Sequence, residues 1–314
     1  MRCVKLTESR QKKIYSSPLG MTLLALFCIL LWSSAIPMTK LGYAAFGIGA
    51  DASVFTKLLF AGIRFTLAGI TVLVLGSAAA RKPLTFHRNQ WGKVLLFGLM
   101  QASVQYLFYY IGLSHSSGTL GSILVSTAAF FVVLAAPLFY PQDKLTVLKG
   151  LGCVLGLVGI VVASAGGQIQ FTLTGEGFLL LSAAANAASS LLSRRYTQEI
   201  PPMVLTGWGL TFGGALLLAV GLAGGGTLPQ VNGQALGILC YLFLLSAVAF
   251  SIWNSLLKYN DAGKVCIFNS LSPIFGTFLS ILILGEDSFQ MRYLISLVLV
   301  CGGVYLVNRT VKKG

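Results

Sequence analysis

The chain has 314 residues, of which 56% are hydrophobic and only 10% are charged. Soluble domains carry about 25% charged residues, so the 22 basic and 8 acidic side chains cannot cover a globule of this length. The composition excludes an ordinary soluble domain, a disordered chain and a disulfide-rich scaffold, and indicates a polytopic membrane protein.

The net charge of +14 is carried by short basic clusters between long apolar runs. Membrane proteins distribute positive charge in this way, so we expect a lipid bilayer as partner and no nucleic acid. The six cysteines are scattered singly, without a CxxC pair or a zinc-like Cys/His spacing. We therefore expect neither a bound metal nor a cofactor.

A bilayer core about 30 Å thick is crossed by about 20 apolar residues in a helix. The short links between the apolar runs leave no room for a large extramembrane domain. The first run follows a basic segment, as a signal peptide does, but it is long enough to span and we expect it to be retained. The sequence predicts an all-α integral membrane fold with ten transmembrane helices, at about 19–40, 53–79, 91–113, 118–140, 146–166, 175–195, 203–224, 233–256, 262–285 and 289–308.

Orientation follows from the positions of the basic residues. If each run crosses the bilayer, nearly all 22 Lys and Arg residues fall on the side that holds the N-terminal tail, 1–18, and the C-terminal tail, 309–314. The positive-inside rule then places both tails in the cytoplasm, with the cell membrane as the expected location. The opposite loops contain no Lys or Arg, at about 41–52, 114–117, 167–174, 225–232 and 286–288.

The ends of the two halves of the chain can be aligned. Asp143 is followed sixteen residues later by Gly159, and Glu286 is followed sixteen residues later by Gly302. Each half holds five predicted spans, an odd number, so the halves would enter the membrane in opposite orientations. Inverted repeats of this kind are common in transporters. We therefore expect two inverted five-helix repeats, over 19–166 and 175–308.

Several short motifs add to this pattern: Trp32-Ser33-Ser34-Ala35, Phe60-Ala61-Gly62-Ile63-Arg64-Phe65, Ser272-Pro273-Ile274-Phe275, Leu284-Gly285-Glu286 and Gly302-Gly303-Val304. Together they resemble the drug/metabolite transporter superfamily, and within it the EamA-type ten-helix transporters. The first half departs from the family pattern, with Asp143 where Glu is usual and Ala128 near the position that Pro273 takes in the second half. The family exports amino acids, their metabolites, drugs and related small solutes, so the resemblance implies solute transport and does not specify the solute.

Polar residues at membrane depth are the candidate site residues, because burying them in lipid is costly. Arg64 lies well inside the second span, where it would pair with an anionic group such as a substrate carboxylate. The alternatives are bonding to backbone carbonyls and snorkelling along a tilted helix.

The ninth span offers a second group of candidates. Pro273, near its centre, cannot bond to the carbonyl of Asn269, and Ser270 lies in the same turn. A freed carbonyl beside small polar side chains would contact substrate, unless the group is a packing kink that neighbouring helices satisfy.

Two further spans carry polar residues along one face. Asn186 lies in the middle of the sixth span, and Gln101, Gln105 and Tyr109 recur at four-residue spacing in the third. Amides and rings suit a cavity for neutral or zwitterionic metabolites, although interhelical hydrogen bonding would explain each residue equally. Trp32, Trp253 and Asn254 are weaker candidates.

The expected function is therefore secondary transport of a small organic solute by alternating access, in the direction of export and plausibly by a monomer. No carboxylate lies mid-membrane, so no proton carrier is evident, and the Walker pattern of ATP-driven pumps is absent. A passive channel stays open as an alternative, and so does a lipid-modifying membrane enzyme. We expect no catalytic residues, because no acidic or histidine-rich cluster is visible.

Overall fold

The computed structural model describes residues 12–49, 51–115, 124–163, 172–284 and 291–309. Within these ranges every regular element is a helix, which confirms the all-helical prediction for the part of the chain that is described. The main helices are α2 (Pro18–Ala45), α3 (Val54–Ala80), α4 (Trp91–Gly98), α5 (Gln105–Ser114), α7 (Ala128–Phe139), α8 (Val147–Ala163), α9 (Phe178–Tyr196), α10 (Pro202–Ala223), α11 (Gly233–Tyr259), α12 (Ala262–Cys266), α13 (Ser272–Leu284) and α14 (Met291–Asn308).

Two of the predicted spans contain a change of helix type. A π-helical segment, η2 (Leu99–Val104), joins α4 to α5, and a 3₁₀ segment, η4 (Ile267–Leu271), joins α12 to α13. A short π-helical turn, η3 (Leu173–Gly177), precedes α9, and a 3₁₀ turn, η1 (Arg88–Gln90), precedes α4.

The length and apolarity of the helices agree with a membrane location. Within the described residues, six helical segments are long and apolar enough to cross a bilayer, and three shorter apolar helices accompany them. Many side chains on the outside of the molecule are large and apolar, for example Leu138, Val147 and Val298, as expected of a lipid-facing surface. The chain is a multi-pass membrane protein.

Local sequence sets where several helices begin and end. Ser17 accepts a hydrogen bond from the Gly20 amide at 3.0 Å at the start of α2, and Asn232 accepts one from Ala235 at 2.8 Å at the start of α11. The left-handed residue Arg81, with φ of 51°, ends α3.

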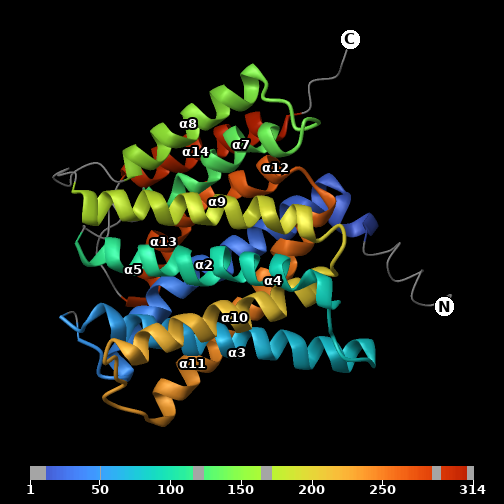
Figure 1. Ribbon diagram of the computed structural model, residues 1–314. Coiled ribbons are helices and arrows are strands. Elements are labelled where there is room, and N and C mark those ends of the chain that lie inside the picture. Colours follow the sequence, from blue (N-terminus) through green and yellow to red (C-terminus); the bar gives the residue numbers. More distant parts are fainter. Residues whose placement is uncertain (1–11, 50, 116–123, 164–171, 285–290, 310–314) are drawn as a thin grey trace.

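The helices are grouped in two bundles that do not follow chain order. In the first bundle, α9 packs against α5 and α7, and in the second bundle, α2 packs against α11 and α13. In Figure 1, α8 and α14 lie together at one edge of the molecule, α3 and α10 lie together at the other, and α9 runs between them. Each bundle thus combines helices from both halves of the chain.

Glycines bring the backbones of α3 and α10 into direct contact. A Cβ atom on Gly214 would lie 2.4 Å from the Thr66 nitrogen, and one on Gly62 would lie 2.4 Å from the Leu218 nitrogen. The pair α8 and α14 is similarly close, since a Cβ on Gly152 would lie 2.7 Å from the Gly303 oxygen. Small residues allow such close contact between membrane helices.

Candidate functional site

Arg64 lies inside the protein, where α3 faces α11. Its side chain is buried, with the residue 7% exposed, and its Nε donates a hydrogen bond to Ser246 Oγ at 3.1 Å. Ser246 in turn donates to the Leu242 carbonyl at 2.9 Å. Among the described residues, neither a carboxylate nor a backbone carbonyl pairs with the guanidinium. A buried arginine that lacks an anionic partner is a favourable place for an anionic ligand.

Tyrosines surround this arginine. The Arg64 charge interacts electrostatically with the hydroxyl of Tyr43 from α2 and with three tyrosines of α5. The rings of Phe65 and Tyr106 lie 4.4 Å apart, centroid to centroid. Phenol hydroxyls beside a guanidinium add hydrogen-bond donors for an anion in an otherwise apolar setting. We call this group the Arg64 cluster: Arg64, Ser246, Tyr43, Tyr106, Tyr109 and Tyr110.

Trp32 lies next to the Arg64 cluster and is joined to it by aromatic contacts. Its ring centroid is 5.2 Å from that of Phe250 and 5.0 Å from that of Trp253, and Phe250 in turn lies 6.3 Å from Phe65. Its Nε1 atom is buried and has no hydrogen-bond partner in the described part of the chain. Buried indole N–H groups usually have one, so this donor is available to a ligand.

Gln101 and Gln105 lie on the same membrane segment as the tyrosines. Both side chains are buried, and the Oε1 atom of each has no partner among the described residues. Gln101 belongs to the π-helical segment η2, and such segments occur frequently at functional sites. The two amides therefore resemble Trp32 in presenting polar atoms that the described protein does not satisfy.

The ninth span differs in detail from the sequence prediction. Pro273 is the second residue of α13, so its missing N–H falls in the first turn and no continuous helix is kinked. Ser270 is fully buried, and its hydroxyl donates to the Ile267 carbonyl at 2.6 Å, within its own turn. Asn269 is half-buried in η4. No described contact joins these three residues to the Arg64 cluster.

Some polar residues of α9 and of its neighbour α11 join helices by hydrogen bonds, whereas others remain candidate site residues. Asn186 is half-buried, whereas Ser182 is buried and donates to the Gln105 carbonyl at 2.8 Å. Asn254 of α11 is fully buried, accepts from Ser193 at 2.7 Å and donates to Thr206 at 2.8 Å. Ser182 and Asn254 thus hold helices together, which is the alternative that the sequence left open for such residues.

The structure adds residues that the sequence did not single out. Tyr43 and Ser246 belong to the Arg64 cluster, but they lie on other helices, Tyr43 on the preceding helix α2 and Ser246 on α11, 182 residues away from Arg64. Aromatic or hydroxyl residues are common in apolar spans, so no local signal distinguishes these two. Only the packing of α2 and α11 against α3 brings them to the arginine.

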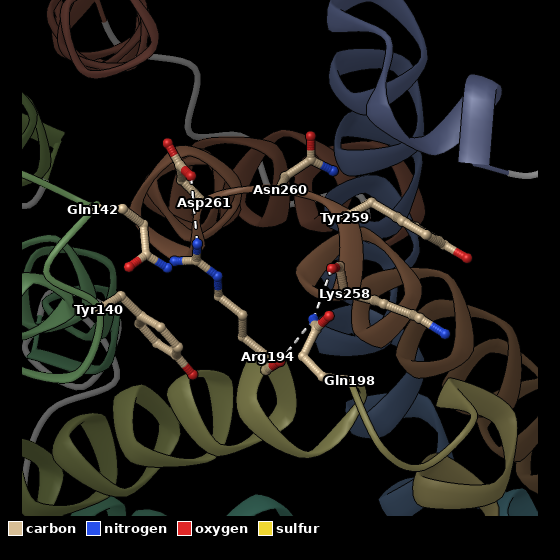
Figure 2. A pocket seen from close by; sticks show the side chains of 8 residues that line it. All are labelled: Tyr140, Gln142, Arg194, Gln198, Lys258, Tyr259, Asn260 and Asp261. Atoms are coloured by element: carbon tan, nitrogen blue, oxygen red, sulfur yellow. Dashed lines mark hydrogen bonds and ion pairs between the residues drawn. The ribbon is translucent and has the colours of Figure 1, made fainter.

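A second group of polar residues lies at the end of the molecule where Tyr15 contacts Tyr259. We call this end of the molecule the tail end. Figure 2 shows Arg194 reaching from α9 towards Asp261. A cavity of about 340 Å³ opens here, lined by Tyr140, Gln142, Arg194, Gln198, Lys258, Tyr259, Asn260 and Asp261. Arg194 also pairs with the buried Asp143. Burial raises the pKa of the Asp143 carboxyl, and the hydrogen bond from Arg194 acts in the opposite direction.

Metal chemistry has no visible place in the part of the chain that the structure describes. No three His, Cys, Asp or Glu side chains come together there as a metal site would require.

Comparison with known proteins agrees with this architecture. The chain is 27% identical over 310 residues to an uncharacterized transporter of Synechocystis, with 92% of this chain and 89% of the relative covered. It is 26% identical over 303 residues to the inner membrane transporter YedA of Escherichia coli, with 92% of each covered. A crystal structure with 22% sequence identity has the same fold, with a TM-score of 0.75 over 92% of this chain and 98% of the other.

The EamA-like transporter family matches residues 19–165 and again residues 173–309, which together make up most of the sequence. The chain therefore belongs to the EamA-like transporter family.

Proposed function

We propose that this membrane transporter carries small organic solutes with a carboxylate group, such as amino acids or related metabolites, by alternating access. Export is the proposed direction. The observation that carries the proposal is the buried guanidinium of Arg64, which bonds to Ser246 and to no anion of the described protein. A charged group in this position needs an ionic partner to offset its desolvation, and a solute carboxylate would supply it.

The other predicted site residues complete the proposed site. Tyr109 is part of the Arg64 cluster, and Trp32, Gln101 and Gln105 offer buried polar atoms without described partners. We propose that these atoms bind the polar groups of the solute while the surrounding rings contact its apolar part. Asn186, Asn269, Ser270 and Pro273 would line the path between the bundles at a distance from Arg64.

The proposed mechanism rests on ten spans in two inverted repeats, 19–166 and 175–308. Three glycines of α3 recur in α10 at one constant offset, Gly62 as Gly207, Gly69 as Gly214 and Gly76 as Gly221. The contacts repeat as well, since α9 packs against α5 and α7 just as α2 packs against α11 and α13. The family matches the two parts of the chain separately. These three observations support the repeat, and a site between repeats is typical of carriers.

The test begins with purified protein and a panel of carboxylate solutes, each paired with its amide. Binding stabilises the native state by mass action, so carboxylates that bind will raise the melting temperature. Arg64→Gln should weaken their binding by about tenfold or more, because a charge-assisted bond contributes about 1.5–3 kcal/mol. The amides should lose little. Lys93→Gln, at the exposed pair with Glu199, is the control.

Liposome counterflow then separates the functional classes. A carrier will show saturable counterflow of the identified solute that Arg64→Gln abolishes and Lys93→Gln leaves intact. Flux without counterflow would identify a channel, and conversion of a lipid would identify an enzyme. If Arg64→Gln folds and transports carboxylates like the parent protein, the proposed site is wrong.

A further inference from the structure

Arg194 is held firmly on the first bundle. It lies in the last turn of α9, and both of its terminal nitrogens engage Asp143, Nη1 with Oδ2 and Nη2 with Oδ1 at 3.1 Å. The Tyr140 ring lies 4.2 Å from the guanidinium carbon, and the Tyr140 hydroxyl donates to the Leu191 carbonyl at 2.7 Å. Asp143 is only 2% exposed. A bidentate, stacked and buried arginine has little freedom to move away from α7 and α9.

The same guanidinium reaches the turn that follows α11, a helix of the second bundle. Its Nη2 lies 3.5 Å from Oδ1 of Asp261, which immediately precedes α12. A second bridge lies beside it, since Gln198 Nε2 donates to the Lys258 carbonyl of α11 at 2.9 Å. Both bridges cross the tail-end cavity (Figure 2), from α9 and the turn that follows it to the α11–α12 turn.

The two ion pairs of Arg194, with Asp143 and with Asp261, differ in strength. The contact with Asp143 is bidentate and buried, whereas the contact with Asp261 is long and single, and the Asp261 side chain is 34% exposed. Water partly screens the Arg194–Asp261 pair, so this contact costs less to break than the contact with Asp143. Asp261 also has an alternative partner in Lys264, at 3.4 Å. Arg194 is therefore fixed to Asp143 on one side and holds Asp261 on the other side by a contact that can break.

We propose that Arg194 is a gating residue that latches the two bundles together at the tail end. Anchored by Asp143 and Tyr140, it holds Asp261 and keeps this end of the solute path closed. When the bundles move apart, the Arg194–Asp261 and Gln198–Lys258 bridges break, the Asp143 pair persists and the tail-end cavity widens. The latch rests on the proposed function, because only an alternating-access carrier needs a releasable closure.

A cysteine of the native sequence can report whether the tail end is open. Cys266 of α12 is fully buried, in the same apolar core as Leu191, and lies within electrostatic reach of Arg194. Separation of α12 from both α7 and α9 would expose its thiol to a small reagent. The rate of Cys266 modification therefore measures opening of the tail end without knowledge of the solute.

The experiment uses the full chain with its other cysteines (Cys3, Cys28, Cys153, Cys240 and Cys301) changed to alanine, and follows N-ethylmaleimide labelling of Cys266 by mass spectrometry. Asp261→Asn should label about two- to fivefold faster than the parent, and Arg194→Gln at least as fast as Asp261→Asn, because the closed state loses its bridge. Asp261→Glu, which keeps the charge, should stay close to the parent rate. Lys93→Gln is the matched control, since it breaks an exposed ion pair outside the latch.

A second reporter distinguishes gating from local loosening. In a background without Cys266, Ala45→Cys places a thiol on the last residue of α2, at the end opposite Tyr15 and outside the Arg64 cluster. If opening one end closes the other, Arg194→Gln should slow labelling at position 45 while it speeds labelling at Cys266. Parent-like rates at Cys266, or faster labelling at both positions, would overturn the latch. Loss of counterflow in Arg64→Gln with this reciprocal pattern intact would confirm the two proposals separately, because labelling requires no solute.

Discussion

Two buried polar side chains, Asn254 of α11 and Arg64 of α3, differ in how far the described protein satisfies them. Asn254 is satisfied on both sides, by Ser193 of α9 and Thr206 of α10. Arg64 has one described hydrogen-bond partner, Ser246, and no counter-charge. A satisfied polar group contributes to stability, whereas an unsatisfied one is available to a ligand.

Removing the Asn254 amide should therefore affect stability and leave solute binding intact. Asn254→Leu, similar in volume, should lower the free energy of unfolding by about 1–2 kcal/mol, since interhelical hydrogen bonds in membranes contribute about 0.6 kcal/mol on average and up to about 1.7. Ser189→Ala is the control, because the described hydrogen bond of the Ser189 hydroxyl is to the Asn186 carbonyl of its own helix. Thermal unfolding in detergent measures both, and equal effects would contradict the assigned role of Asn254.

At the scale of elements, α3 and α10 are held together by contact between their backbones. Glycines at seven-residue spacing remove the side chains that would separate the helices, on α3 at Gly62 and Gly69 and on α10 at Gly207, Gly214 and Gly221. Spacing by seven keeps them on one face of each helix. The pair forms one edge of the molecule in Figure 1 and carries Arg64 on α3.

A single methyl group at this contact should destabilise the protein. Gly214→Ala places a Cβ 2.4 Å from the Thr66 backbone nitrogen, so the helices must separate, at a cost of about 1–3 kcal/mol. Gly237→Ala on α11 meets no atom within 4 Å and should be neutral or slightly stabilising. Melting temperatures of the two variants test this, and an unchanged value for Gly214→Ala would rule out the close packing.

On the scale of the whole molecule, the two bundles mix the halves of the chain. Helix α9 leaves its own half to pack with α5 and α7, and α2 does the reverse. Exchange of this kind makes each bundle depend on both halves. The proposed latch at Arg194 joins the two bundles at the tail end, where the proposed movement would have to break a contact.

The proposed topology has a direct test. Fusions of alkaline phosphatase at either end of the full chain should be inactive, and green fluorescent protein at the same ends should fluoresce, because both tails are expected in the cytoplasm. Phosphatase inserted at 225–232, a loop without Lys or Arg, should be active. Tails that report opposite compartments would exclude an even number of spans and with it the inverted repeat.

Sequence by itself determined the class of this protein. Apolar runs of bilayer length can satisfy their backbone only as helices, so the all-helical membrane fold follows from composition and spacing. The cost of a charge in lipid singled out Arg64. At Pro273 the sequence predicted a freed Asn269 carbonyl in mid-span, whereas the proline lies in the first turn of α13 and that carbonyl accepts from the Ser272 N–H. The change of helix type at Leu99–Val104 had no such local signal.

Tertiary structure alone decided which polar residues meet. Arg64 and Ser246 are 182 residues apart, and Arg194 and Asp143 are 51 apart, so both contacts depend on how whole helices pack. The same packing satisfied Asn254 and left Trp32, Gln101 and Gln105 with unpaired atoms. Whether a buried polar group has a partner is a property of neighbouring helices, and residues adjacent in the chain do not determine it.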